Sequence, residues 1–537
     1  MLASIFNDVI GPVMRGPSSS HCAAALRIGR LARDLAGGLP EAVLVEFDRA
    51  GSLPTTHTSQ GSDMGLFGGL LGWEASDSRL PDAEHALQAA GCQVTFVTVD
   101  VGDPHPNTYR LTLSRNGESH TLRAISTGGG MIEVLAIDEV LLSIHGDFHE
   151  TLFWCRSTGD VERLTATLRD TSPEGICEAI EVHTAFPRRI AGPLVQVRTR
   201  TPLPASTITA LQAAGLATRA RQLAAVLPVL SGAGTAAPFA SAASLLAADG
   251  GEGLPLWKHA IAYECQRGGL SEDEVLTRML KIVRILQASI DEGIAGTRYD
   301  DRVLPAQAPA FQAALTAGRL LGDDTLNQIV LATTALMEVK SSMGVIVAAP
   351  TAGACAALPA AVIVVARLRG LDDEAMARAL LAAGLIGIFI TSAWSFAAEV
   401  GGCQAEGGSA AAMAAAGLVT LADGTLEQSL AAASMALQSM LGLICDPVAN
   451  RVEVPCLGKN VMAATNALAC ANMALAGFAE VIPFDEVVAS ARVVSEQMPR
   501  ELRCTALGGL AITPTSRAIE ARLALKQHSG CGGCGCG

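Results

Sequence analysis

The half of the chain from about residue 241 to 526 carries one helix-forming pattern after another and few stretches with strand character. Its apolar residues are largely alanine, leucine and valine, a composition that suggests closely packed helices. Residues 270–274 (LSEDE) show the capping-box signature of a helix start. The apolar run 379–396 is nearly long enough to span a bilayer, but its alanines and glycines favour a buried core helix. We therefore expect an all-α domain over residues 241–526.

The rest of the chain has a different pattern, and 537 residues are more than one hydrophobic core can comfortably serve. Over residues 1–138, helix and strand patterns alternate, which predicts an α+β domain. The expected elements are a helix over 23–35, strands over 41–47 and 93–101, and a hairpin over 108–125 with its turn at 115–118.

Residues 139–218 predict a small α/β unit. Its expected strands lie near 140–144, 179–182 and 194–197, and its expected helices over 161–168 and 205–214. Residues 219–240 are apolar but interrupted by glycine and proline, so we expect a linker there. The glycine- and cysteine-rich residues 527–537 predict a flexible tail.

Three cysteines of the helical half stand among small or turn-forming residues: Cys403, Cys445 and Cys456. No histidine occurs between residues 260 and 527, so a metal centre in this half would be bound by thiolates, which select iron–sulfur clusters or zinc. The intervals of 42 and 11 residues match no standard zinc spacing. Three thiolates are one fewer than a [4Fe–4S] cluster usually has, which would leave one iron open to substrate. Three unrelated buried thiols are the alternative interpretation.

Three further segments carry candidate site residues, and the first and the third of them predict a site for an anion. Residues 16–21 (GPSSSH) run directly into a helix, so Ser18, Ser19 and Ser20 lie where free backbone N–H groups could bind a carboxylate, beside His21. An ordinary capped helix is the alternative. Residues 51–63 form a hydroxyl-rich loop with a histidine, and residues 349–355 (APTAGAC) precede another apolar helix. A polar loop and a packed thiol are the plainer interpretations of these two.

Together these motifs resemble the iron–sulfur-dependent L-serine dehydratases (L-serine ammonia-lyases), with both parts of the enzyme on one chain. Residues 8–14, 103–108 and 128–133 resemble the family's β part. Four segments resemble the α part: residues 347–353, 402–406, 443–449 and 454–456. Residues 508–515 (GGLAITPT) resemble its C-terminal signature. The resemblance implies a [4Fe–4S] cluster on Cys403, Cys445 and Cys456. It also implies conversion of L-serine to pyruvate and ammonia, with an ACT-like segment over 139–218 and an all-α catalytic domain.

The hydroxyl-rich loop 51–63 departs from the family pattern. Members commonly read GHGTD where this chain has residues 59–63 (SQGSD), so Gln60 replaces a histidine proposed to act in catalysis. A glutamine side chain cannot act as a base. The candidates for catalysis are therefore His21, His57 and Lys459, with Lys340 as a further buried-lysine candidate.

The serine carboxylate is expected at a hydroxyl-rich helix start, from residues 18–20 or from Thr351, with Asp63 as a further substrate-binding candidate. The tail cysteines Cys531, Cys534 and Cys536 could reach the open iron and cap it when substrate is absent, or could be idle.

The partners expected are a small amino-acid substrate and a second copy of the chain in a homodimer. The net charge of −14 argues against nucleic acid and anionic membrane. The first eight residues lack the basic segment of a signal peptide, so we expect a cytoplasmic protein. The alternatives are the same chemistry on threonine or cysteine, a non-catalytic iron–sulfur sensor, or a pyridoxal-phosphate dehydratase.

Overall fold

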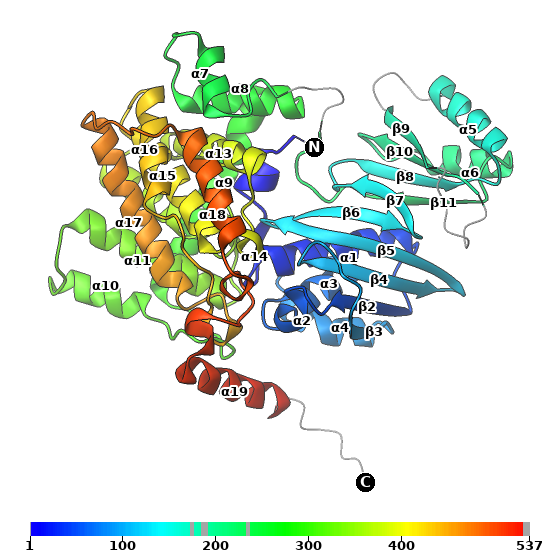
Figure 1. Ribbon diagram of the computed structural model, residues 1–537, viewed down its shortest axis with the longest axis horizontal. Helices are drawn as coiled ribbons and strands as arrows, with labels where there is room; N and C mark the ends of the chain where they lie inside the picture. Colours follow the sequence, from blue (N-terminus) through cyan, green and yellow to red (C-terminus); the bar gives the residue numbers. More distant parts are fainter. Residues whose placement is uncertain (1, 172–176, 184–191, 232–236, 530–537) are drawn as a thin grey trace.

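The computed structural model describes residues 2–171, 177–183, 192–231 and 237–529. Figure 1 shows a helical body beside two β-sheets, with the N-terminus lying between them. The last helix, α19, extends away from the helical body. The division into a sheet-containing N-terminal part and a helical C-terminal part is the one the sequence predicts.

The larger sheet has six strands in the order β3-β2-β4-β5-β6-β7, in which only β2 and β3 run parallel. Helices α1 and α3 pack on it and on each other and close a hydrophobic core. The predicted helix and hairpin are confirmed by α1 and by the pair β4–β5. The bounds are α1 Ala24–Leu35, β2 Ala42–Asp48, α2 Leu53–Thr56, α3 Ser62–Leu70, α4 Ala83–Ala89, β3 Gln93–Val99, β4 Thr108–Arg115, β5 Glu118–Gly128, β6 Met131–Ile137 and β7 Val140–Ile144.

The smaller sheet has the antiparallel order β11-β8-β10-β9, with helices in a βαββαβ succession. Its bounds are β8 His149–Trp154, α5 Thr158–Thr171, β9 Cys177–His183, β10 Leu194–Thr199, α6 Ala205–Ala213 and β11 Arg219–Leu223. Two expectations differ from this. The strand near 140–144 is β7, which pairs with β6 in the larger sheet. The expected linker begins with β11, which completes the small sheet.

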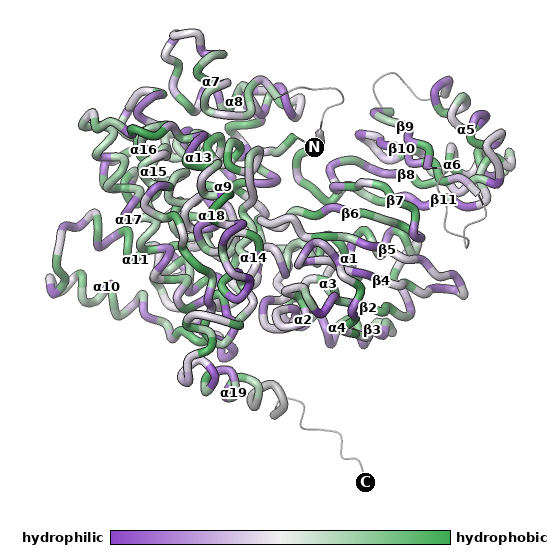
Figure 2. Tube along the Cα trace, in the orientation of Figure 1, coloured by the Kyte–Doolittle hydropathy of each residue, from purple (hydrophilic) through white to green (hydrophobic). Residues whose placement is uncertain are grey.

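The helical domain buries most of its central helices. Its bounds are α7 Ala242–Asp249, α8 Leu256–Gly268, α9 Glu272–Ala295, α10 Ala308–Thr316, α11 Asp324–Ser341, α12 Ala357–Leu368, α13 Asp373–Ala393, α14 Ala398–Gly401, α15 Ser409–Leu421, α16 Leu426–Gln438, α17 Cys456–Leu475, α18 Phe484–Gln497 and α19 Pro514–Ser529. Ser271 and Glu274 form the predicted capping box of α9. Figure 2 shows hydrophobic residues along most of α15 and mixed character along α5.

Among the described helices, α13 alone is long and apolar enough to cross a membrane by length and composition. It packs against α8, α9 and α15, and 78% of its apolar window is buried inside the molecule. The prediction of a core helix over the run 379–396 is thus confirmed, and the helix ends at Ala393.

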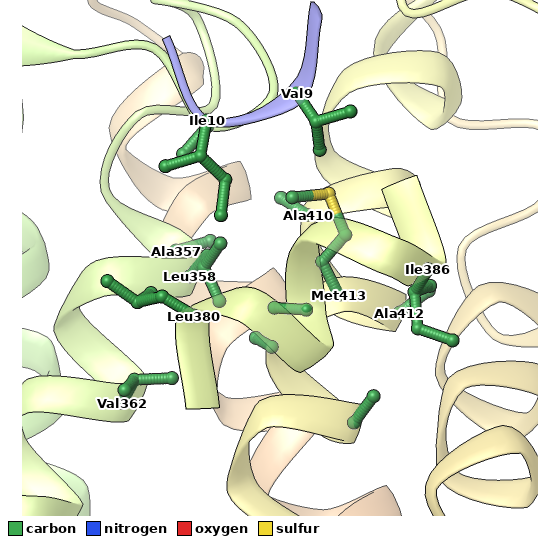
Figure 3. Close-up of a cluster of buried hydrophobic side chains, with 14 of the residues drawn as sticks. Val9, Ile10, Ala357, Leu358, Val362, Leu380, Ile386, Ala410, Ala412 and Met413 are labelled. Atoms are coloured by element: carbon green, nitrogen blue, oxygen red, sulfur yellow. The ribbon is translucent and has the colours of Figure 1, made fainter. Parts of the chain in front are cut away.

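The N-terminal segment joins the two parts of the molecule. Its π-helical turn Ile5–Val9 packs on α13, where Gly387 leaves room for the Val9 side chain. Figure 3 shows Val9 and Ile10 lying among side chains of α12, α13 and α15. Further along, β1 (Val13–Met14) pairs with β12 (Ile346–Val347) of the helical domain. The serine motif that follows β1 is therefore held against the loop that precedes α12.

Candidate active site

The three predicted cysteines lie at the ends of helices that meet at the domain junction. Cys403 precedes the turn that leads into α15, Cys445 lies in the loop between α16 and α17, and Cys456 is the first residue of α17. All three are buried. Cys445 and Cys456 line one cavity, and Cys403 and Cys456 line a second that adjoins it. The two cavities share Gly353, Glu406 and Cys456.

Backbone hydrogen bonds hold two of the cysteine loops together. The amide that follows Cys403, at Gln404, donates to the carbonyl oxygen of Leu443 at 2.9 Å. Gly402, directly before Cys403, has a φ of 69°. A side chain at Gly402 would come within 2.8 Å of the Met498 sulfur, so only glycine fits this turn. The glycine before Cys403 thus allows its segment to approach those of Leu443 and Met498 closely.

The thiols influence each other's ionisation. Contact with the Cys403 and Cys504 side chains, and then burial, raises the pKa of Cys445 well above its usual value. Burial, and then the charge of Cys403, raises the pKa of Cys456. Without a cation these thiols stay protonated, and a bound metal would supply the charge that keeps them as thiolates. The donor set therefore fits a metal centre.

The thiols surround the cavities and do not converge on one point. In the described part of the chain, no three His, Cys, Asp or Glu side chains come close enough to hold a single metal ion. A multi-iron cluster takes one thiolate on each of several irons, so its ligands are spread apart.

Lys459 lies beside Cys403. Its Nζ donates to Asp446 Oδ1 at 2.8 Å and to the carbonyl oxygen of Ile444 at 2.6 Å, and lies 3.6 Å from the Cys403 sulfur. Burial lowers the pKa of Lys459, but the charges of Cys403 and Asp446 outweigh burial and raise its pKa above the usual value. This lysine is held as a cation.

The predicted serines belong to the same junction. Ser18 and Ser20 line the first cavity, whereas the hydroxyl oxygen of Ser19 accepts a hydrogen bond from the Ala352 amide at 3.1 Å. Thr351 donates to Glu406 Oε1 at 2.7 Å. The sheet-containing part thus contributes hydroxyl groups to a cavity that cysteines of the helical domain also line.

His21 is fully buried behind these serines. Its Nδ1 lies 3.0 Å from Ser18 Oγ, and its Nε2 lies 2.8 Å from Thr56 Oγ1. Burial, and then the charge of His57, lowers the pKa of His21 to about 3. The ring is therefore neutral at ordinary pH.

His57 and Asp63 lie apart from the thiols. His57 Nδ1 is 2.6 Å from Asp63 Oδ1, and its ring stacks on Phe96 at a centroid distance of 5.0 Å. His57 lines a neighbouring cleft with Arg451 and residues of α19. Gln60, by contrast, is buried and lines the cavity of Cys445 and Cys456.

The sequence analysis missed two carboxyl groups of this site, Glu399 and Glu406. Both line the first cavity. Glu399 Oε1 lies 3.5 Å from His21 Nδ1, and its buried Oε2 atom has no hydrogen-bond partner among the described residues. Burial raises the pKa of Glu399 to about 7 and also raises the pKa of Glu406. No pattern in the sequence gives this burial, although both residues flank the Cys403 motif.

A fourth cysteine was also missed. Cys504 lines the first cavity with Cys445 and Cys456, and it packs against Cys403 and Cys445. The tail cysteines Cys531, Cys534 and Cys536 lie outside the described residues.

Comparison with known proteins gives the class of this site. The family model of the serine dehydratase alpha chain matches residues 251–511. The "Probable L-serine dehydratase, alpha chain" of Bacillus subtilis is 38% identical over 49% of this chain and 88% of its own length. The L-serine dehydratase alpha chain of Peptoniphilus asaccharolyticus is 35% identical over 50% of this chain and 92% of its own length. The "Probable L-serine dehydratase, beta chain" of B. subtilis is 42% identical over 27% of this chain and 64% of its own length.

A site of buried thiols, carboxyls and hydroxyls between the two parts of this fold defines, with these relatives, a lyase. The chain belongs to the L-serine dehydratase family, and it carries regions similar to both the alpha and the beta chain on one polypeptide.

Proposed function

We propose that the protein is an L-serine ammonia-lyase, which removes water from L-serine to give aminoacrylate, pyruvate and ammonia. The observation that carries the proposal is one cavity lined both by Cys445 and Cys456 and by Ser18 and Ser20, from opposite sides of the junction. Membership of the L-serine dehydratase family supports the choice of substrate. Threonine and cysteine are the alternative substrates for the same chemistry.

The cofactor proposed is a [4Fe–4S] cluster held by Cys403, Cys445 and Cys456. When bound, it would supply a Lewis acid for the departing hydroxyl group, because hydroxide is a poor leaving group. The chain's own contribution is to keep the three thiols at a buried junction and to place Lys459 beside Cys403. A lysine cation there offsets the negative charge that thiolate ligands bring into the protein.

The substrate carboxylate is proposed to bind at the hydroxyl groups of Ser18 and Ser20. These residues flank Ser19 at the start of a π-helical turn, whose first N–H groups favour an anion. Ser19 itself is held by the Ala352 amide, and Thr351 by Glu406. These two residues therefore position the loops, while Asp63 is engaged with His57 and Thr58 outside the cavity.

Glu399 is proposed to take the α-proton. A general base works best when its pKa lies near the operating pH, and the pKa of Glu399 is raised to about 7 by burial. Glu399 lines the cavity, and its Oε2 atom has no hydrogen-bond partner among the described residues, which leaves one oxygen available to substrate. The pKa of His21, at about 3, is too low for an effective base near neutral pH. We assign His21 the positioning of Glu399.

Two proposals concern the rest of the chain. The small βαββαβ unit is proposed to be ACT-like and to pair with a second copy in a homodimer; its edge strand β9 leaves Val182 exposed. Sedimentation of the full chain should then give twice the mass of 55.2 kDa. The tail cysteines are a candidate cap of the open iron; if they fill this role, deletion of residues 530–537 should change the oxygen sensitivity of the cluster.

The proposed function is tested by anaerobic reconstitution followed by a keto-acid assay with serine, threonine and cysteine. We expect about four irons and four sulfides per chain and pyruvate formation from L-serine. Cys403→Ala should lose both cluster and activity, whereas Cys470→Ala, a buried thiol on α17, should keep both. An active Cys403→Ala protein with intact cluster would rule out the assignment.

A further inference from the structure

Cys504 brings a fourth sulfur to the cavity. It follows α18 on a segment far in sequence from the three motif cysteines, yet it is 4% exposed and packs with Cys403 and Cys445. It also lines the cavity of Cys445 and Cys456. A buried cysteine is ordinarily a small hydrophobic residue, but this one lies among polar groups and other thiols.

The backbone holds Cys504 in place beside Cys445. The Cys445 amide donates to the Leu502 carbonyl oxygen at 2.8 Å, and the Cys504 amide donates to the Cys445 carbonyl oxygen at 3.2 Å. Cys504 has a φ of 52°, in the left-handed region that residues with a side chain rarely adopt. Such strain persists only where surrounding contacts enforce it, and here the two hydrogen bonds to residue 445 do so.

The Cys504 side chain meets groups from both parts of the molecule. Its Sγ lies 3.6 Å from Gln60 Nε2, and Gln60 in turn donates to Asn450 Oδ1 at 3.0 Å. The Cys445 side chain is also in contact with it. A long amide contact is weaker than a bond to a metal, so the sulfur is free to exchange partners.

We propose that Cys504 is a fourth metal-binding cysteine, which occupies the open position of the cluster when substrate is absent. This inference rests on the proposed function. Thiolate is a soft ligand suited to iron in such clusters. On ligation the Cys504 thiol releases its proton to solvent and a sulfur–iron bond forms; when substrate binds, that bond breaks and the thiol is protonated again. The enzyme would thus protect its open iron without the tail.

Mössbauer spectroscopy of full-length protein reconstituted with ⁵⁷Fe tests the inference independently of activity. Wild-type protein without serine should show irons with sulfur ligands only. A distinct iron site should appear in Cys504→Ala and in wild-type protein after L-serine is added. Cys504→Ser keeps the side-chain size and should show the same distinct site. Identical spectra of wild type and both variants would overturn the inference.

A second measurement distinguishes Cys504 from the tail cysteines, and from an unrelated buried thiol, as the cap of the open iron. Ferricyanide oxidation without serine should convert Cys504→Ala to the three-iron form, seen by electron paramagnetic resonance, about 10- to 100-fold faster than wild type. Cys470→Ala and a chain lacking residues 530–537 should match wild type. Fast conversion in the truncated chain but not in Cys504→Ala would assign the cap to the tail. Wild-type protein that binds no iron would refute the proposed function itself, whereas four irons with an unaffected Cys504→Ala would refute only this inference.

Discussion

The Nδ1 atom of His21 and the Oε1 atom of Glu399 lie 3.5 Å apart across the junction of the sheet-containing and helical parts. The second oxygen of Glu399 has no hydrogen-bond partner among the described residues, and Glu399 lines the thiol cavity. Docking of the two parts therefore buries a carboxyl group and orients it at once, and neither part could do so alone.

Replacement of this carboxyl group gives the first prediction. Glu399→Gln keeps the shape of the side chain but removes the proposed base, so kcat should fall by about 10²- to 10⁴-fold. In wild type, kcat/KM should rise with pH through about 7, because Glu399 must be deprotonated to accept the α-proton. The residual activity of the variant should lack this rise. Glu496→Gln, on the exposed face of α18, should retain the wild-type profile.

The same titration should appear in stability measurements. Because burial raises the folded-state pKa of Glu399 from 4.5 to about 7, the proton favours the folded state. Ionisation then opposes folding by an amount that grows between these pH values and stays constant above them. Glu399→Gln should therefore be more stable than wild type at pH 8, by up to about 3 kcal/mol, and lose that advantage toward pH 5. Urea unfolding at both pH values measures this, and equal stability at pH 8 would contradict the buried-carboxyl account.

The two histidines give the second prediction, because the structure separates them. His21→Gln removes the ring that contacts both Ser18 and Glu399, so kcat should fall by about tenfold or more, with a shift of the pH profile. His57→Gln should leave kcat and the profile near wild type, because His57 faces the neighbouring cleft. Steady-state kinetics of the two variants decide this. A larger loss in His57→Gln would return His57 to the role of base.

The third prediction concerns how the N-terminal segment docks. A Cβ at Gly387 would lie 2.1 Å from Val9 Cγ1. Gly387→Ala should therefore destabilise the protein by about 1–3 kcal/mol. Helix propensity alone would give the opposite sign, a gain of about 1 kcal/mol. Gly159→Ala in α5 is the matched control, because a Cβ there would lie an ordinary 3.8 Å from its nearest neighbour, Ser157 Oγ. Urea unfolding of both variants measures the sign, and a stabilised Gly387→Ala would contradict this docking.

Local patterns predicted much of the architecture. The capping box at Ser271 and the turn at 115–118 depend on neighbouring residues, and both appear as expected. The partner of β7 could not be predicted this way, since strand pairing depends on distant residues. The sequence places Val140–Ile144 next to the small unit, whereas its backbone pairs with β6.

The site was predicted where motifs carry it and missed where burial creates it. The motifs select Cys403, Cys445 and Cys456, and the helix start selects Ser18; all four line the two cavities, and their roles stay predictions. Glu399 was missed because its raised pKa depends on desolvation by segments distant in sequence. Cys504 was missed because its approach to Cys445 comes from the fold of the segment after α18.

The fourth prediction concerns the wall shared by the two cavities, at Gly353. A Cβ there would lie 2.7 Å from Glu406 Oε1 and 2.9 Å from Oε2. The Gly353 carbonyl oxygen accepts a hydrogen bond from Asn460 Nδ2 at 2.8 Å, so the backbone is not free to move away. Gly353→Ala should displace Glu406 and, through it, Thr351. We expect iron content to fall and KM for L-serine to rise by about 10- to 100-fold.

Gly458→Ala provides the matched control for Gly353→Ala. Gly458 lies in α17 two residues after Cys456, and a Cβ there meets no described atom within 4 Å. Alanine also favours the helix by about 1 kcal/mol, so this variant should keep its iron and its kinetics. Iron analysis and steady-state kinetics on both proteins give the comparison. If Gly353→Ala bound iron and serine as well as Gly458→Ala does, the close approach of Gly353 to Glu406 would have no part in forming the site.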